Sequence, residues 1–153
     1  MPEAHPEIWF YHLERSTLNE VLPGLLEKCR ERGWRGLVRA DDARLLEELD
    51  ERLWTWRDDA FLAHGRATEP FPERQPILLS ETGENLNGAQ ALFIVDGAQL
   101  GDTKGYERCF IIFDGRDEAS LTGARERWKA LKQAGANLAY WRQSPEGRWE
   151  KAA

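Results

Sequence analysis

The sequence is poor in cysteine, which limits the metal and redox sites that it can hold. Its two cysteines, Cys29 and Cys109, lie far apart and form no CxxC pair. The three histidines, His5, His12 and His64, have no metal-ligand spacing to one another or to a cysteine. Structural zinc sites need such clustered ligands. We therefore expect no metal site, and two buried free thiols in a reducing cytoplasm rather than a disulfide.

Long apolar runs are also missing. No run approaches the ~20 residues that a membrane-spanning helix needs. The N-terminal MPEAHPE has neither the basic nor the apolar region of a signal peptide. We therefore expect a cytoplasmic protein. At 153 residues, the chain is long enough for one domain with a hydrophobic core, and we expect a single domain over 1–153.

Positive charge is in the minority, because the formal net charge is -6 at pH 7. Proteins that bind DNA or RNA without sequence preference present a broad basic surface to the phosphates. The acidic balance argues against that function as the main task of this chain. With this net charge, a basic surface on the protein can only be a local patch.

The glycine-rich phosphate loops of nucleotide-binding proteins are absent. The first expected strand-to-helix turn, at 14–17, contains no glycine, and the chain has no GxGxxG, Walker A or GxSxG motif. Asp96-Gly97 and Asp114-Gly115 follow expected strands, and turn chemistry is the interpretation we favour for both pairs. We expect no cofactor and no catalytic residues. The alternative is a nucleotide- or phosphoester-handling enzyme with a metal at Asp96 or Asp114.

The sequence does contain an alternation of apolar runs and amphipathic segments. A helix with the capping box Thr17/Glu20 follows the first run, and a second helix begins after Asp41-Asp42. Strand, helix, strand, helix is typical of βαβ units with right-handed crossovers. We predict a mostly parallel sheet of about five strands with helices on both faces. The expected strands are 8–13, 35–40, 77–80, 91–95 and 109–113, with 137–141 as a candidate for a last strand.

The third expected helix, 116–135, is basic in an otherwise acidic chain. Arg125, Lys129 and Lys132 recur at three- and four-residue steps and therefore share one stripe of the helix. Trp128 lies at the border between this stripe and the apolar face. Two interpretations are open, a solvated basic surface or a small anion-binding site with an aromatic wall. The apolar face consists of Leu121, Ala124, Trp128 and Leu131.

Seven tryptophans are many for this length, and tryptophan is enriched at binding hot spots. Trp54 ends the second helix on its apolar side, so core packing is the default interpretation. The long connection at 54–76 is rich in aromatic residues, which argues against disorder. Within it, Phe61 interrupts a polar segment and is either an anchor against the sheet or part of an exposed apolar patch. His12 is expected in the core or at a strand end, and His64 in a local hydrogen bond.

Six short segments, spread over nearly the whole chain, form a recognisable set. They are FYHL at 10–13, LDERLW at 49–54, FLAHG at 61–65, LFIVDGA at 92–98, ARERWKALKQAG at 124–135 and the closing GRWEK. In this order the segments resemble the chi subunit family of bacterial DNA polymerase III, and LDERLW, FLAHG and RERWK are the most specific in combination. Ala63 stands where the family commonly has proline, and residues 1–7 extend before the first strand.

The resemblance implies a non-enzymatic adaptor with a Rossmann-like α/β/α sandwich and no bound nucleotide. Proteins of the family connect two partners within the clamp-loader complex. One partner is the acidic C-terminal tail of the single-stranded-DNA-binding protein, SSB, which ends in an aromatic residue with a free carboxylate. The other is the psi subunit. The position linked to psi binding corresponds here to Phe61.

The resemblance also implies which residues bind the SSB tail. The family uses an arginine, an aromatic residue and a lysine on the RERWK helix, with the tryptophan of LDERLW nearby. In this sequence these are Arg125, Trp128, Lys129 and Trp54. Lys132 extends the positive stripe by one more turn. We expect Trp128 and Trp54 to form the apolar wall of the site if the end of the second helix lies near the basic helix.

Overall fold

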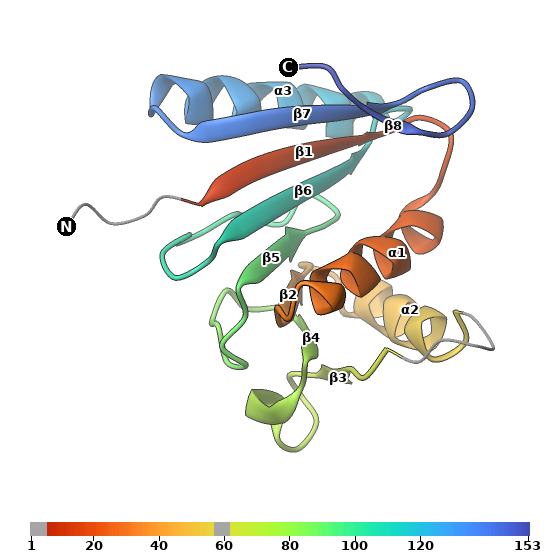
Figure 1. Ribbon diagram of the computed structural model, residues 1–153, viewed down its shortest axis with the longest axis vertical. Coiled ribbons are helices and arrows are strands. Elements are labelled where there is room, and N and C mark those ends of the chain that lie inside the picture. The colour runs from red at the N-terminus through yellow and green to blue at the C-terminus, as the bar shows by residue number, and fades with distance from the viewer. Residues whose placement is uncertain (1–5, 57–61) are drawn as a thin grey trace.

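The computed structural model describes residues 6–56 and 62–153, which form a mixed α/β structure around one sheet (Figure 1). In these two ranges the sheet has eight strands in the order β3-β4-β2-β5-β6-β1-β7-β8. All neighbouring strands are parallel except β7 and β8. The strands are β1 (Glu7–Leu13), β2 (Gly36–Arg39), β3 (Gly65–Arg66), β4 (Ile77–Ser80), β5 (Ala91–Ile94), β6 (Arg108–Asp114), β7 (Asn137–Gln143) and β8 (Trp149–Lys151). The helices are α1 (Leu18–Glu31), α2 (Ala43–Trp54), α3 (Glu118–Gln133) and the short 3-10 helix η1 (Pro72–Arg74).

The prediction of a mostly parallel sheet with helices on both faces is confirmed, but the prediction of about five strands is wrong. The candidate last strand at 137–141 is strand β7, and β3 and β8 were not predicted. β3 has two residues, one of them a glycine, and β8 is a three-residue edge strand with two charged side chains. Neither carries the apolar run that reveals the central strands, which are buried on both faces.

Local signals account for the ends of α1. The Thr17 hydroxyl accepts from the Glu20 backbone N–H at 3.3 Å, and the Glu20 carboxylate accepts from the Thr17 N–H at 3.0 Å. This reciprocal capping box begins the helix where the sequence predicts it. Pro23 lies inside α1 with its side chain buried, and the helix continues past it. Gly33, at φ +79°, takes the left-handed conformation that ends many helices.

The other two long helices begin at aspartates instead. Asp42 accepts from the Arg44 N–H at 2.9 Å, and Asp117 accepts from the Ser120 N–H at 3.0 Å. Both carboxylates satisfy backbone donors that the first helical turn leaves unpaired. At its other end α3 stops at Gln133, and Gly135 has φ +80°, as predicted for a glycine just beyond the last turn.

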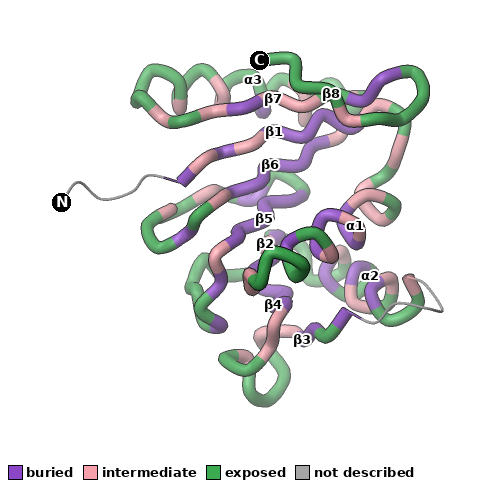
Figure 2. The backbone as a smooth tube through the Cα atoms, viewed as in Figure 1, coloured by how far each residue is buried: buried purple, intermediate pink, exposed green. Residues whose placement is uncertain are grey.

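Two apolar layers lie on the two faces of the sheet. The buried residues gather in the strands of the sheet, and most of the loops are exposed (Figure 2). Helices α1 and α2 cover one face, where Leu22 and Leu49 pack with Phe93, whose ring stacks on Phe110 at a centroid distance of 4.5 Å. Helix α3 covers the other face, where Ala124 packs in the layer that includes Phe10 and Ile111. Helices α2 and α3 are therefore separated by the sheet (Figure 1).

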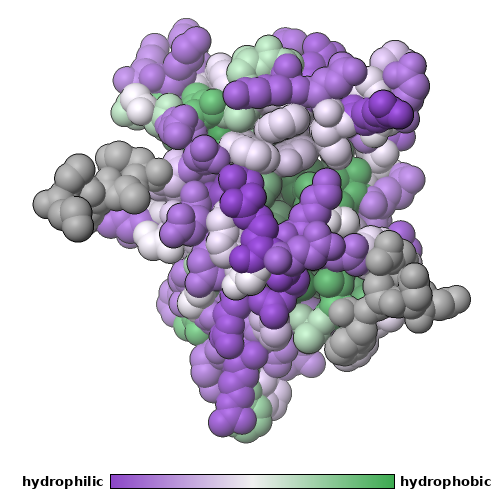
Figure 3. All heavy atoms as spheres, in the orientation of Figure 1, coloured by the Kyte–Doolittle hydropathy of each residue, from purple (hydrophilic) through white to green (hydrophobic). Residues whose placement is uncertain are grey.

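The surface on the α1 and α2 side is largely hydrophilic, with a few hydrophobic residues in the hollows between the helices and the neighbouring strands (Figure 3). Trp54 lies on this side and is 57% exposed, so the interpretation of Trp54 as a core residue is wrong. It is the last residue of α2. The buried residues of α2 are Leu46, Leu49 and Leu53.

The two cysteines, His12 and His64 lie in the environments that the sequence predicts. Cys29 and Cys109 are both free and buried, and burial raises the pKa of the two thiols to about 11 and about 12. His12 and His64 are both buried. His64 hydrogen-bonds through Nδ1 to the Leu62 carbonyl at 2.7 Å. Of the helices in the described ranges, none is long and apolar enough to cross a membrane.

Candidate functional site

The outward side of α3 carries the basic strip, which we define as Arg125, Lys129 and Lys132. All three side chains are exposed. Over residues 6–56 and 62–153, none of the three forms an ion pair with a carboxylate. Arg125 and Lys129 are four residues apart on the helix, a spacing at which like charges repel by about 0.2–0.5 kcal/mol. The cations of the strip therefore remain available to an acidic partner.

Trp128 lies at the border of the strip, as the sequence predicts, and is half-buried. Its ring meets Phe10 of β1 edge-to-face at 5.2 Å and Tyr140 of β7 edge-to-face at 5.5 Å. Such aromatic pairs stabilise by about 0.5–1.5 kcal/mol beyond the area that they bury. These contacts fix the ring beside the cations. The strip and Trp128 thus form a cationic surface with a rigid aromatic edge.

A polar cluster lies beside Trp128, at the ends of β1 and β7. His12 Nδ1 and the Tyr140 hydroxyl share a hydrogen bond of 2.7 Å, and His12 Nε2 lies 3.5 Å from the Glu14 carboxylate. Glu14 in turn accepts from Arg142. Burial lowers the pKa of His12 and raises the pKa of Tyr140. The charge of Arg125 lowers the pKa of both groups, so Arg125 belongs to the same electrostatic environment.

This cluster was not identified from the sequence. Tyr140 and Arg142 belong to β7, which the sequence indicates only as a candidate strand. His12 is 128 residues from Tyr140 along the chain. No local pattern connects them, because only the pairing of β1 with β7 brings their side chains together.

Trp54 does not lie beside the basic strip. It lies at the end of α2, on the opposite face of the sheet from α3, and packs against His64 at a centroid distance of 4.7 Å. His64 Nε2 is 2.8 Å from the carboxylate of Asp50, which belongs to α2. This contact links the segment that follows α2 to the helix. Phe61, the residue matched to the psi position, lies outside the described residues.

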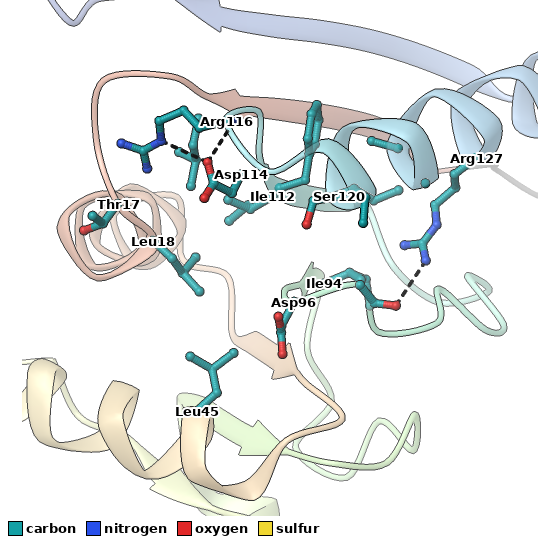
Figure 4. Close-up of a pocket in the computed structure, with 17 residues that line it drawn as sticks. Thr17, Leu18, Leu45, Ile94, Asp96, Ile112, Asp114, Arg116, Ser120 and Arg127 are labelled. Carbon is teal, nitrogen blue, oxygen red and sulfur yellow. Dashed lines mark hydrogen bonds and ion pairs between the residues drawn. The ribbon is translucent and has the colours of Figure 1, made fainter.

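A cavity of about 480 Å³ opens at the carboxyl ends of β5 and β6 (Figure 4). Leu18, Leu45 and Ile94 form apolar parts of its wall, and the polar side chains of Asp96 and Arg127 extend toward it. Arg127 donates to the Gly97 carbonyl at 3.4 Å, and burial lowers its pKa. Ligands of open α/β sheets commonly bind at such strand ends. The cavity is therefore where an enzymatic site would be sought.

The side chains around the cavity do not form a metal site. Asp114 accepts from the backbone N–H of Arg116 at 2.9 Å and from its Nε at 3.0 Å, and these hydrogen bonds lower the pKa of the carboxyl. Asp96 and Gly97 have φ values of +53° and +72°, as in a tight turn. In the described part of the chain, no three histidine, cysteine, aspartate or glutamate side chains are grouped as metal ligands. Turn geometry therefore accounts for the Asp96 pair, as the sequence analysis favours, and Asp114 is held by an arginine.

Comparison with known proteins supports the resemblance found in the sequence. The family model described as DNA polymerase III chi subunit, HolC, matches residues 6–139. The probable DNA polymerase III subunit chi of Rickettsia prowazekii (strain Madrid E) is 28% identical over 153 residues, covering 94% of this chain and 90% of the relative. DNA polymerase III subunit chi of Haemophilus influenzae is 29% identical over 122 residues, covering 80% and 85%. The chain belongs to the DNA polymerase III chi subunit family.

Proposed function

We propose that this chain is an adaptor of the clamp-loader complex that connects the acidic C-terminal tail of SSB to the psi subunit during DNA replication. Its family is that of a non-catalytic accessory subunit of DNA polymerase III, which argues against the alternative of a nucleotide- or phosphoester-handling enzyme. The observation that supports the proposal is the basic strip on α3. Three exposed cations without carboxylate partners in the described ranges flank a half-buried tryptophan, on a chain with a net charge of -6.

Each part of the tail has a counterpart on this surface. Arg125 presents a planar guanidinium that suits the terminal carboxylate. Trp128 offers an apolar ring edge for the terminal aromatic residue. Lys129 and Lys132 continue the positive charge along the helix for the acidic residues upstream. Trp54 is left out of this site because the sheet separates it from α3.

Titration of a fluorescently labelled tail peptide, followed by fluorescence polarisation, tests this site. Arg125→Ala should weaken binding by ~2–4 kcal/mol, because the terminal carboxylate loses its partner in a partly desolvated contact. Lys132→Ala should cost less than ~1 kcal/mol, because its contact is exposed. The same peptide without its last residue is the control ligand. Equal binding of the full peptide by wild type and Arg125→Ala would refute the site, and equal affinity for both peptides would refute the carboxylate contact.

The psi connection is proposed for the segment that contains Phe61. Removing a partner-facing aromatic side chain typically costs ~2 kcal/mol or more of binding. Phe61→Ala should therefore weaken capture of a co-expressed psi subunit while the SSB-tail peptide binds as before. Circular dichroism of the variant provides the control for folding. A variant that is simply unfolded would identify Phe61 as a core residue and contradict the assignment.

A further inference from the structure

The proposed tail site needs an aromatic surface larger than one tryptophan edge. A terminal aromatic side chain that leaves water gains most when rings enclose it from two sides, since aromatic pairs prefer edge-to-face or offset contacts. Trp128 supplies one side. The sequence suggests Trp54 for the other, but the structure places Trp54 on the opposite face of the sheet.

Tyr140 is the ring that the structure places beside Trp128. The two rings are nearly perpendicular, at 86°, with centroids 5.5 Å apart. Both are half-buried, so each keeps part of its surface in contact with solvent. Phe10 underlies the pair, stacked on Tyr140 at 6.3 Å and edge-to-face with Trp128 at 5.2 Å, and is fully buried. The angle between two such rings on a buried base forms an apolar corner.

His12 holds the Tyr140 ring in that position. The hydrogen bond of 2.7 Å between His12 Nδ1 and the Tyr140 hydroxyl fixes the far end of the side chain. His12 is itself fixed, because its ring packs against Phe113 at 5.0 Å and lies close to the backbone of Gly115. A ring held at both ends loses little conformational freedom when a ligand contacts it.

The charges around the corner favour an acidic ligand. Arg125 acts electrostatically on both His12 and Tyr140, and Arg142 acts on both from β7. The neighbouring acids are held by arginines, since Glu14 accepts from Arg142 and Asp114 accepts from Arg116. Of the charged groups at this corner, Arg125 forms no ion pair in the described ranges.

We propose that Tyr140, positioned by His12, is the second aromatic wall of the acidic-tail site and encloses the terminal aromatic residue together with Trp128. This assignment rests on the proposed function of α3. It gives Tyr140 a contact with the ligand and His12 a positioning role. It also makes the site a surface of two elements, α3 and β7, rather than of a single helix.

A double-mutant cycle between protein and peptide tests the contact. The probes are an acidic tail peptide ending in phenylalanine and the same peptide ending in alanine, both with a free carboxylate. Tyr140→Thr, which keeps a residue suited to a strand, should weaken the phenylalanine peptide about tenfold, as expected for an aromatic contact. It should change the affinity of the alanine peptide less than about twofold, because the deleted ring then has nothing to contact. A purely structural effect of the substitution would weaken both peptides by the same factor and would overturn the proposal.

Two further variants complete the experiment. Tyr140→Phe keeps the ring and removes the hydroxyl, so the phenylalanine peptide should lose about two- to threefold in affinity through the lost contact with His12. If Tyr140→Thr does not fold, Tyr140→Leu, which also lacks the aromatic ring, takes its place in the cycle. Full wild-type affinity in Tyr140→Phe would overturn the role of His12. Trp54→Ala, on the other face, should leave both affinities unchanged. A selective loss for the phenylalanine peptide in Trp54→Ala would assign the wall to Trp54 instead.

The proposed function and this inference fail in different ways. If wild-type protein binds neither peptide, or binds them independently of Arg125, the tail site on α3 is wrong and Tyr140 has no site to complete. If binding depends on Arg125 but Tyr140→Thr affects both peptides equally or not at all, the tail site stands and the assignment of Tyr140 is wrong.

Discussion

Gly115 shows how a single residue without a side chain shapes this region of the molecule. It follows β6 and lies against the ring of His12, where a Cβ atom would come within 1.9 Å of Nε2. Its φ lies outside the left-handed region, so space rather than backbone conformation requires a glycine here. The position of the His12 ring, which hydrogen-bonds to Tyr140, therefore depends on the absence of a side chain at residue 115.

Two glycines of this region, Gly115 and Gly123, should respond differently to substitution by alanine. Gly115→Ala should lower the free energy of unfolding by about 1–3 kcal/mol, because the methyl group must displace a buried ring. Gly123 lies inside α3, where a Cβ atom would meet nothing within 4 Å, so Gly123→Ala should raise the free energy of unfolding by about 0.5–1 kcal/mol. Urea denaturation followed by circular dichroism measures both. Equal effects of the two substitutions would contradict the close approach at Gly115.

The stability of the fold should depend on pH through His12. Burial lowers the pKa of His12 below 6.5, with an opposing contribution from Glu14. As pH falls through 6.5, the unfolded chain takes up the proton on His12 before the folded protein does. The contribution of His12 to the free energy of unfolding is therefore complete above pH 6.5. It is lost as the pH falls from 6.5 through the folded-state pKa of His12.

Nuclear magnetic resonance titration of the His12 ring should give a folded-state midpoint below 6.5. Urea denaturation should show a decrease in stability between neutral pH and the folded pKa that is smaller in His12→Gln. The wild-type protein and the variant should be compared in the same buffers. A midpoint above the ordinary histidine value would mean that Glu14, rather than burial, dominates the environment of this histidine.

At the scale of elements, α3 combines two roles that conflict. Its inward side packs Ala124 and Leu121 on the sheet, while its outward side holds the basic strip without carboxylate partners in the described ranges. Residues three and four apart on a helix are neighbours, so the cations repel one another. A helix selected for stability alone would place more acidic residues among these cations than Glu126. The retained repulsion is consistent with a binding surface.

Lys129→Gln tests this conflict within α3. The substitution removes one repulsion with Arg125 and one with Lys132, and it also removes an attraction to Glu126 three residues earlier. The free energy of unfolding should therefore change by less than about 0.5 kcal/mol. Affinity for the tail peptide should fall, because one cation of the strip is lost. A variant that lost stability but kept its affinity would show that Lys129 serves the fold rather than the partner.

The whole molecule has a net charge of -6, yet its helix α3 carries a local basic strip. The Debye length is about 8 Å at physiological ionic strength and about 3 Å at 1 M, so added salt screens exposed contacts between the strip and an acidic tail. Burial of the terminal ring is not screened. Tail affinity should therefore fall as sodium chloride rises and then level off above zero. Complete loss at high salt would mean that charge alone holds the tail.

The local features of this protein could be predicted from its amino-acid sequence. Repeats of 3.6 residues predicted α3 and placed Trp128 at the border of its basic stripe, because a helix orders side chains by spacing alone. Capping residues at Thr17, Asp42 and Gly135 predicted helix ends, because they bond to backbone groups within the same few residues. Apolar runs predicted the central strands, and the motifs spread along the chain indicated the family that the comparison confirmed.

Which of these features lie side by side depends on how distant segments pack, and the sequence did not predict it. The order of the strands puts His12 of β1 beside Tyr140 of β7, although 128 residues separate them, and the crossover of each helix decides which face it covers. Trp54 and Trp128 are both tryptophans on helices, yet the sheet separates them. Contacts of this kind arise from packing between distant segments, which no local periodicity encodes. For the same reason β3 and β8 were missed, since pairing with a neighbouring strand, rather than an apolar run of their own, makes them strands.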